Sequence, residues 1–307
     1  MLLTGPVGPD GDSLGACLAL AAVLDADEVR VTVAGRLPPR YAFLPTTDRI
    51  VDDESLEPLG AYDAVVVLDG DRHRLTPPVE AAFAAAQVRG LVDHHASSTH
   101  DGYTHVWHEP EAESACSMLY RAFQAWQVPV DQRMASWLYA GIVFDTGGFR
   151  HSNTTPQTHR TAAELVATGI DHTTLHARVL AERSIGGARA MGAVLSSAEW
   201  DGARVVVGRV PQALQRSLHL EDGDLEGVVE CLLHTTGTEL AALLIERPDG
   251  RVKVSFRSRC DVDVARAARH LTPHGGGHPR AAGAVLDLGL AEAEQAVRRV
   301  LNPGDPT

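Results

Sequence analysis

The segment YDAVVVLD, residues 62–69, sets the fold class, because it is a run of apolar residues that ends in an acidic one. Strands buried on both faces of a parallel sheet have such continuous apolar runs. Two similar runs are VRVTVA at 29–34 and VRGLVD at 88–93. We therefore expect a mostly parallel sheet in the first part of the chain.

Helical patterns lie between and after these runs. We expect helices at 13–25, 112–127, 132–143 and 157–168. Alternating strands and helices predict an α/β domain in which helices cover a parallel sheet. The first domain, which we interpret as catalytic, is expected to span residues 1–170.

The pattern changes after residue 170. Residues 171–199 are charged and less regular, and we expect them to form a partly helical linker. Pro248-Asp249-Gly250 is typical of a hairpin turn between two strands. We predict a smaller α+β domain at 200–303 with a mixed or antiparallel sheet and a frayed tail. Its expected strands are 204–210, 240–246, 252–257 and 284–288, and its helices are 226–233, 263–271 and 291–301.

The composition limits the partners. The 307 residues carry a formal net charge of −13 and contain no basic run, which excludes long nucleic acid as a partner. A small phosphorylated ligand remains compatible, because bound cations can supply local positive charge. No apolar run is long enough for a membrane span, and the N-terminal segment lacks the basic start of a signal peptide, so a cytoplasmic location is expected.

The cysteines do not suggest a zinc site. Cys17, Cys116, Cys231 and Cys260 lie far apart and form no CxxC pair. We expect buried free thiols, because free cysteine packs as a small hydrophobic residue.

Acidic clusters follow strand-like or helix-like segments of the first domain. In open parallel sheets the carboxyl ends of the strands face one crevice, so we expect these side chains to converge. Packed carboxylates repel each other unless cations lie between them. The clusters are Asp10-Gly11-Asp12, Asp69-Gly70-Asp71, Asp93-His94-His95 and Asp145-Thr146-Gly147.

Taken alone, each cluster also has a simple structural explanation. Asp10 or Asp12 can cap a helix, Asp69 can end a strand, and His94-His95 can be a surface pair. Asp145-Thr146-Gly147 can be a helix stop. Their joint occurrence favours a metal site, and Asp and His without thiolate suit Mn²⁺ or Mg²⁺. Two such ions can activate a water and stabilise in-line displacement at phosphorus.

The second domain has a glycine-rich signal, HGGGH at 274–278, followed by PRAAG at 279–283. Glycines let a backbone approach a ligand closely and direct N–H groups at an anion. Arg257 and Arg280 can bind a phosphate or a carboxylate. The alternative is a tight strand-to-helix turn with ordinary surface arginines.

In this order, PDGD, the strand-end Asp69, DHH, DTG and GGGHPRAAG resemble the motifs of DHH phosphoesterases with a DHH-associated C-terminal domain. The resemblance covers about residues 3–300. It is strongest to the bacterial nanoRNases, pAp phosphatases and stand-alone cyclic-di-AMP phosphodiesterases. FDTGGFRHSNTTPQTH at 144–159 and VKVSFRS at 252–258 extend it.

The resemblance implies a role for each site residue. Asp69 bridges two metal ions, for which Mn²⁺ is expected and Mg²⁺ is an alternative, and His95 lies near the scissile phosphate and assists catalysis. The first ion is bound by Asp10, and the second by Asp12, His94 and Asp145. The residues expected to bind substrate are Arg257, Ser258, Gly275, Gly276, Gly277, His278 and Arg280.

The chain departs from the family pattern at a metal position. The family has a histidine ligand of the first metal where this chain has Pro6, so that site is expected to be weakened or lost. His73 is a conceivable substitute, although a solvated loop histidine is the simpler explanation. Ser98 stands near a usual asparagine, and His274 replaces a common glycine.

The resemblance implies an Mn²⁺-dependent phosphodiesterase or phosphatase of the oligoribonuclease type, and a homodimer. Its expected substrates are short oligoribonucleotides, pApA, cyclic-di-AMP and pAp, and its products are mononucleotides. One alternative is a nucleotide-binding protein with weakened catalysis because of Pro6. Another is an inorganic pyrophosphatase of the same superfamily.

Overall fold

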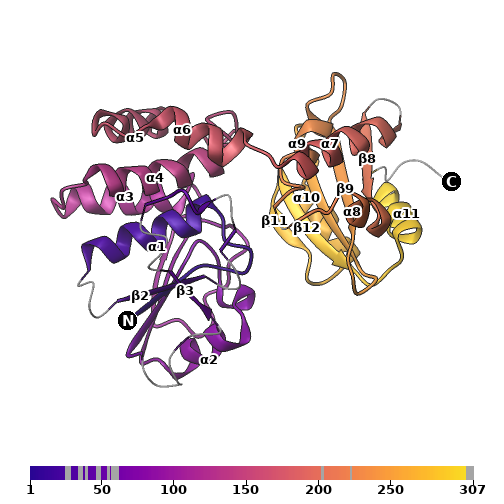
Figure 1. Ribbon diagram of the computed structural model, residues 1–307. Coiled ribbons are helices and arrows are strands. Elements are labelled where there is room, and N and C mark those ends of the chain that lie inside the picture. Colours follow the sequence, from indigo (N-terminus) through magenta and orange to yellow (C-terminus); the bar gives the residue numbers. More distant parts are fainter. Residues whose placement is uncertain are drawn as a thin grey trace. The chain divides into compact units, whose positions relative to one another are not determined.

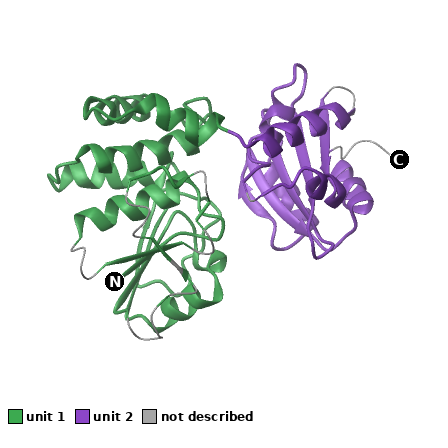
Figure 2. Cartoon of the chain, in the orientation of Figure 1, with its two compact units in different colours: residues 1–182 green, residues 183–307 purple. Residues whose placement is uncertain are grey.

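The computed structural model describes residues 1–24, 29–33, 37–38, 41–45, 50–53, 56, 62–201, 204–221 and 223–301. The chain divides into two compact units, unit 1 at residues 1–182 and unit 2 at residues 183–307 (Figure 2). Both units combine helices with a sheet, so the expected α/β class with a second α+β part is confirmed (Figure 1).

The sheet of unit 1 has six strands in the order β3-β2-β1-β4-β5-β6, and all described pairs are parallel. Its centre is the predicted strand β4, which pairs with β1 through Leu2↔Val65 and with β5 through Ala64↔Val88. The edge strands β3 and β6 were not predicted, because they are short and β6 (HVWH) is partly polar. The bounds are Leu2–Thr4, Arg30–Val33, Ile50–Asp52, Ala64–Leu68, Val88–Asp93 and His105–His108.

The predicted helices of unit 1 are present with shifted ends. Helix α1 begins earlier than expected because Asp10 forms a capping box with Ser13. Helix α4 ends later, so that Asp145 is its last residue rather than part of a loop. The helices are α1 (Gly11–Val23), α2 (Pro77–Ala85), α3 (Ala115–Ala125), α4 (Gln132–Asp145), α5 (Pro156–Ala167) and α6 (His172–His176).

Glycines bring α1 and α4 into unusually close contact. A Cβ at Gly15 would lie 2.4 Å from the carbonyl oxygen of Trp137. A Cβ at Gly141 would lie 2.7 Å from Asp12 Oδ1. Larger residues would push the helices apart, so these two glycines place Asp12 of α1 beside α4.

Unit 2 contains a mixed sheet in the order β11-β12-β10-β9-β8-β7, in which β8 and β9 are parallel and the other pairs antiparallel. The glycine-rich segment forms β11, a short strand paired with β12, instead of a strand-to-helix turn. The last strand lies earlier than the expected 284–288. The strands are β7 (Glu199–Asp201), β8 (Val205–Val210), β9 (Leu240–Glu246), β10 (Val252–Ser258), β11 (Gly276–His278) and β12 (Ala281–Leu286).

Helices pack on both faces of this sheet. One face meets α10 and α11 in a core that includes Val254 and Phe256. The other face meets α7 and α9 over β8 and β9. The helices are α7 (Ile185–Ser197), α8 (Gln212–Ser217), α9 (Val228–Leu233), α10 (Val264–Leu271) and α11 (Leu290–Leu301).

The segment 171–199 is mostly helical. It contains α6, the π-helical turn η5 (Ala177–Ala181) and α7. The units divide after Glu182, so α7 belongs to unit 2. The tail at 302–307 lies outside the described residues, and the domain limits 1–170 and 200–303 remain predictions.

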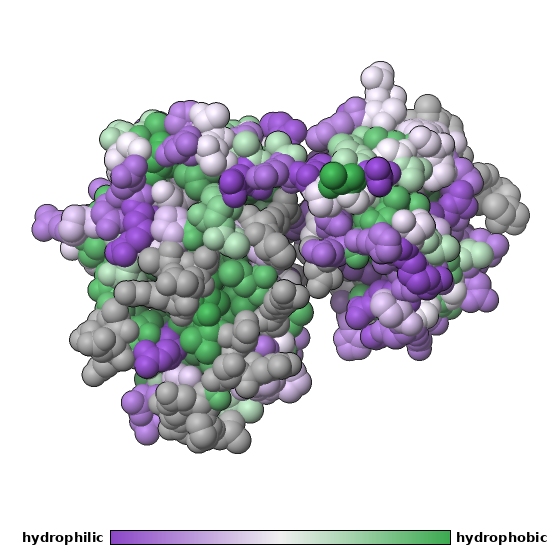
Figure 3. All heavy atoms as spheres, viewed as in Figure 1, coloured by the Kyte–Doolittle hydropathy of each residue, from purple (hydrophilic) through white to green (hydrophobic). Residues whose placement is uncertain are grey.

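The hydropathy of the surface and of the helices can be compared with the absence of long apolar runs in the sequence. Hydrophilic and hydrophobic residues are interspersed on the visible face of each unit (Figure 3). Among the described residues, none of the helices combines the length and apolar character that a membrane crossing needs.

Candidate metal centre

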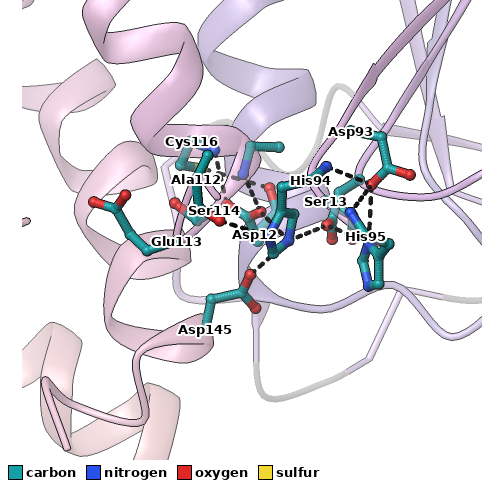
Figure 4. Close-up of polar contacts among 12 residues, drawn as sticks. Asp12, Ser13, Asp93, His94, His95, Ala112, Glu113, Ser114, Cys116 and Asp145 are labelled. Carbon is teal, nitrogen blue, oxygen red and sulfur yellow. Dashed lines mark hydrogen bonds and ion pairs between the residues drawn. The ribbon is translucent and has the colours of Figure 1, made fainter. Parts of the chain in front are cut away.

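Four side chains from different elements of unit 1 converge at one end of its parallel sheet. Figure 4 shows Asp12, His94 and Asp145 beside one another. Asp12 lies in the first turn of α1, Asp69 follows β4, His94 follows β5, and Asp145 ends α4. The carboxyl ends of adjacent parallel strands meet at one edge, which explains why segments far apart in sequence come together. We call these four residues the metal cluster.

The distances within the metal cluster suit a single cation. His94 Nε2 lies 2.9 Å from Asp145 Oδ2, 3.2 Å from Asp69 Oδ1 and 3.9 Å from Asp12 Oδ2. One ligand atom from each residue lies within 4.8 Å of the other three. Ligands that each lie about 2.1 Å from one ion are about 3–4 Å apart. The donor set of three carboxylates and one imidazole fits a divalent metal.

Electrostatics also favour a cation in the metal cluster. Burial, followed by the charge of Asp145, raises the pKa of Asp12 to about 7. Burial and the charges of Asp10 and Asp12 raise the pKa of Asp69 well above its ordinary value. Asp69 Oδ1 is buried and accepts no hydrogen bond within the part of the chain that the structure describes. A cation would relieve both the repulsion and this unmet acceptor.

His94 is the positive partner of these acids in the metal-free chain. Burial lowers its pKa, but the contacts with Asp145 and Asp69 outweigh this effect and raise the pKa to about 12. The imidazolium proton therefore occupies the space that a cation would take. His94 Nδ1 lies 3.2 Å from the carbonyl oxygen of Ala112. If Nδ1 carries the proton of this hydrogen bond, Nε2 can serve as a metal ligand.

Backbone groups hold Asp12 in place. Its Oδ2 accepts a hydrogen bond from the Ala115 N–H at 2.6 Å, and its Oδ1 accepts one from the Cys116 N–H at 2.9 Å. Both donors lie in the first turn of α3, where the helix dipole favours a negative charge. Asp12 is fully buried, so this anchoring keeps its carboxylate directed at His94 and Asp145.

The turn after β4 holds Asp69 in a conformation that few residues adopt. Asp69 has a φ of 65° and Gly70 a φ of 147°. Left-handed backbone at a non-glycine residue is uncommon and is found at functional sites. Asp71 secures the turn, since its Oδ2 accepts a hydrogen bond from the Thr99 N–H at 3.0 Å.

Asp93, the first residue of the DHH motif, organises the loop. Its carboxylate accepts hydrogen bonds from the His94 N–H at 2.8 Å, from the His95 N–H at 3.2 Å and from the Ser98 hydroxyl. His95 Nδ1 lies 2.8 Å from Asp93 Oδ1. Burial tends to raise the pKa of Asp93, but the bonds from His95 and Ser98 lower it to about 2.

The anchoring by Asp93 and the contacts of Ser98 and His108 were not predicted from the sequence. His108 Nε2 lies 2.9 Å from the carbonyl oxygen of His95 and further restrains the loop. An acidic residue directly before two histidines, followed by a serine, is the sequence signal that points to such a buried anchor.

Asp10 is close enough to raise the pKa of Asp69, but it is not a member of the metal-binding groups found among the described residues. Its Oδ1 accepts hydrogen bonds from the Asp12 and Ser13 N–H groups, both at 3.0 Å, as the N-cap of α1. Burial and the charge of Asp145 raise its pKa. Pro6 is buried, and its ring contacts Gly70, next to Asp69. His73 is exposed in the turn η4 (Arg72–Arg74) and joins none of the metal-binding groups found among the described residues.

In unit 2, part of the expected substrate set shares one sheet face. Gly276 pairs with Gly283, which pairs with Ser255, and Arg257 is two residues along from Ser255. Side chains alternate between the faces of a sheet, so these four residues lie opposite the buried Val254 and Phe256. We call Ser255, Arg257, Gly276 and Gly283 the glycine face.

The glycine face has room above it. In the described part of the chain, no atom lies within 4 Å of a Cβ built at Gly276, and at Gly283 the nearest atom is Val254 O at 3.5 Å. Arg257 donates from Nε to Glu230 Oε1 at 2.7 Å. His278, in β11, is half-buried and pairs with Ala281.

Other expected substrate residues lie elsewhere. Ser258 is buried on the opposite face, and its hydroxyl donates to the carbonyl oxygen of Cys260 at 3.0 Å. A Cβ at Gly275 would lie 2.2 Å from Ala268 O, so this glycine serves the packing against α10. Gly277 has a φ of 132°, and Arg280 Nη2 lies 3.3 Å from Asp261 Oδ1.

Comparison with known proteins identifies both units. The family model described as DHH family, N-terminal domain, matches residues 1–142, and the DHHA1 domain model matches residues 202–302. The chain is 33% identical over 301 residues to the bifunctional oligoribonuclease and PAP phosphatase NrnA of Thermus thermophilus, covering 96% of this chain and 86% of that protein.

The chain is also similar to a longer bacterial protein in sequence and to a solved structure in fold. The cyclic-di-AMP phosphodiesterase GdpP of Geobacillus thermodenitrificans is 26% identical over 321 residues, which cover 98% of this chain but 47% of that longer protein. The crystal structure of an exopolyphosphatase-related protein from Bacteroides fragilis has a TM-score of 0.87 at 24% identity, covering 98% of this chain and 91% of that one. This last likeness concerns the fold alone.

Proposed function

The chain belongs to the DHH phosphoesterase family, and on that basis we propose that it hydrolyses short oligoribonucleotides and dinucleotides to mononucleotides. Linear pApA and cyclic-di-AMP are the proposed phosphodiester substrates, and pAp is a phosphomonoester substrate that gives AMP. The names of the relatives support these substrate classes, since they include an oligoribonuclease, a PAP phosphatase and a cyclic-di-AMP phosphodiesterase.

The metal cluster is the observation that carries the proposal. Asp12, Asp69, His94 and Asp145 would hold a divalent cation, for which we propose Mn²⁺, with Mg²⁺ as the alternative. When bound, such an ion supplies Lewis-acid chemistry, which activates water and stabilises negative charge at a phosphoryl group. A protein that only binds nucleotides has no need for three converging acids, two of them buried.

His95 is proposed to act on the substrate. Asp93 holds its Nδ1, and the side chain is 24% exposed, so it faces the solvent side of the metal cluster. In this position the imidazole can donate a hydrogen bond to a phosphoryl oxygen as charge develops during hydrolysis. The contact with Asp93 fixes the orientation of the His95 ring.

The glycine face is proposed to bind the nucleotide part of the substrate. Gly276 and Gly283 leave a flat surface on which a planar base can rest, and Arg257 offers a cation for a phosphate. His278 and Arg280 lie beside it in sequence and remain proposed contacts. Ser258 and Gly275 are supported only as residues that shape this region.

Hydrolysis assays with metal-stripped protein test the proposal. We expect turnover of pApA that rises with added Mn²⁺, and assays of cyclic-di-AMP, pAp and pyrophosphate would rank the substrates. Phosphate release from pyrophosphate with no nucleotide hydrolysis would favour the pyrophosphatase function. Tight nucleotide binding with no turnover at any metal concentration would favour the binding function suggested by Pro6.

A further inference from the structure

Asp10 and the shared Asp69 are the residues expected to bind the first of two metal ions, and we call this position the Asp10 side. It offers fewer ligands than the metal cluster does. The metal-binding groups found in the described residues are the metal cluster itself and the set Asp69, His94 and His95. The second set takes two of its three members from the first, so it does not describe an independent site. Asp10 belongs to neither.

Two atoms beside the metal cluster, Asp10 Oδ1 and His95 Nδ1, already have hydrogen-bond partners. Asp10 Oδ1 accepts three hydrogen bonds, from the Asp12 and Ser13 N–H groups at 3.0 Å and from the Ser13 hydroxyl at 3.2 Å. His95 Nδ1 is 2.8 Å from Asp93 Oδ1 but 3.6 Å from Asp69 Oδ1. Cation binding through Nδ1 would therefore require His95 to give up its hydrogen bond to Asp93.

Residue 6 lies beside the turn that carries Asp69. A Cβ at Gly70 would be 3.0 Å from Pro6 Cγ and 3.1 Å from Pro6 Cβ, so the side chain at this position points at the turn that carries Asp69. The Val7 N–H donates to the carbonyl oxygen of Arg74 at 2.6 Å and holds the segment there. Proline has no donor atom in its ring.

We propose that the substrate-free chain binds one divalent ion, in the metal cluster, and that the Asp10 side holds none because Pro6 provides no ligand. Asp10 and Asp69 would be the remaining protein ligands there, and Asp69 is shared with the metal cluster. One divalent ion also offsets most of the charge of the cluster's three carboxylates. The inference rests on the proposed metal-dependent function and refines it.

The experiment counts bound Mn²⁺ on the full chain without substrate. Metal-stripped protein is dialysed to equilibrium with Mn²⁺, the bound metal is measured by mass spectrometry, and electron paramagnetic resonance reports whether bound ions are coupled. We expect one equivalent with the spectrum of an isolated ion. Two equivalents of similar affinity, or a spin-coupled pair, would overturn the proposal.

Variants at position 6 separate a missing ligand from other causes. Pro6→His should raise the count to two and give a coupled spectrum, whereas Pro6→Ala, the matched control without a ligand, should keep one equivalent. A folded Pro6→His variant that still binds one ion would contradict the assignment of residue 6. If Pro6→Ala binds two equivalents of Mn²⁺, the proline ring excludes the second ion by its bulk. The assignment to a missing ligand would then be wrong.

Variants at the acids assign the single ion. Asp12→Asn should lose the bound equivalent, and Asp10→Asn, whose amide oxygen can still cap α1, should retain it. If Asp10→Asn loses the ion and Asp12→Asn keeps it, the ion is bound on the Asp10 side and not in the metal cluster. That result would contradict the proposal. The metal count is measured without substrate and does not depend on activity. A protein that binds one ion but hydrolyses no substrate would therefore refute the proposed hydrolysis and still support the count of one ion.

Discussion

The metal cluster of unit 1 and the glycine face of unit 2 are built in opposite ways. The metal cluster consists of ionisable side chains, three of them buried, and its Asp12 carboxylate is held by backbone N–H groups of α3. The glycine face consists of half-buried small residues and one arginine held by Glu230. Charges that repel each other must be fixed by the fold, whereas a flat binding surface needs only the absence of side chains.

This difference predicts how each region responds to mutation. Changes in the metal cluster should affect catalysis and metal binding strongly, because every neighbour is charged or hydrogen-bonded. Changes on the glycine face should affect the KM for nucleotides and leave the chemistry of simple phosphodiesters nearly unchanged.

The largest effect is expected for Asp69→Ala. Asp69 contributes to both metal-binding groups, so its loss should lower kcat for pApA about a thousandfold. The measurement is Mn²⁺-dependent release of AMP. The exposed Asp63, just before β4, provides a control as Asp63→Asn, which should retain wild-type activity. Near-normal turnover of Asp69→Ala would refute the role of the metal cluster.

A smaller loss is expected for Asp93→Asn. This change removes the charge that orients His95 and the DHH loop, and comparable changes next to metal ligands reduce affinity or activity about 10- to 100-fold. The loss of metal affinity would be measured by titration with Mn²⁺, and the loss of activity by kcat for pApA. Ser98→Ala removes one donor to Asp93 and should have a weaker effect; a stronger effect would contradict the central position of Asp93.

The pH dependence of metal binding should follow Asp12, whose pKa burial and Asp145 raise to about 7. An ion must displace this proton and the proton of His94, so as the pH falls Mn²⁺ affinity should fall about tenfold per pH unit above pH 7, where only His94 releases a proton, and about a hundredfold per unit below it. The raised pKa of Asp12 also means that the metal-free chain loses stability as the pH rises from about 4 to 7. The increase in Tm on adding Mn²⁺ should therefore be larger at pH 8 than at pH 5.5; an equal or smaller increase would oppose this explanation.

On the glycine face, Gly283→Val should raise the KM for pApA about tenfold. The space above Gly283 accepts a side chain, so the variant should fold, but the added methyl groups would occupy the surface proposed for the base. Hydrolysis of bis-p-nitrophenyl phosphate, which has no nucleotide, serves as the reference reaction. Parallel losses with both substrates would indicate misfolding or a different nucleotide site.

The smallest effect is expected for Arg257→Ala. Glu230 already satisfies part of its charge, so we expect a severalfold rise in the KM for pApA, with little change for bis-p-nitrophenyl phosphate. Glu230→Gln tests the pairing, since it should free Arg257 and lower the KM. Equal effects of Arg257→Ala on both substrates would place Arg257 outside the nucleotide site.

Much of the fold followed from local sequence patterns. The apolar runs at 62–69 and 88–93 predicted β4 and β5, and the motif order predicted the family that the comparisons confirm. The edge strands β6 and β11 were not predicted. Edge strands bury less apolar surface, so their sequences carry a weaker pattern, and β11 depends on pairing with β12.

For the site, the sequence determined which residue types are present, and the tertiary structure decided what each of them contacts. Motifs predicted the acids and histidines of unit 1, but not that Asp12 binds the first turn of α3 or that Asp93 anchors His95. The packing of helices on the sheet decided which face of β10 is buried, so that Ser258 lies on the core side with Val254 and Phe256 and Arg257 lies on the other. These outcomes depend on contacts between distant segments and on strand register, and neighbouring residues in the sequence do not encode either of them.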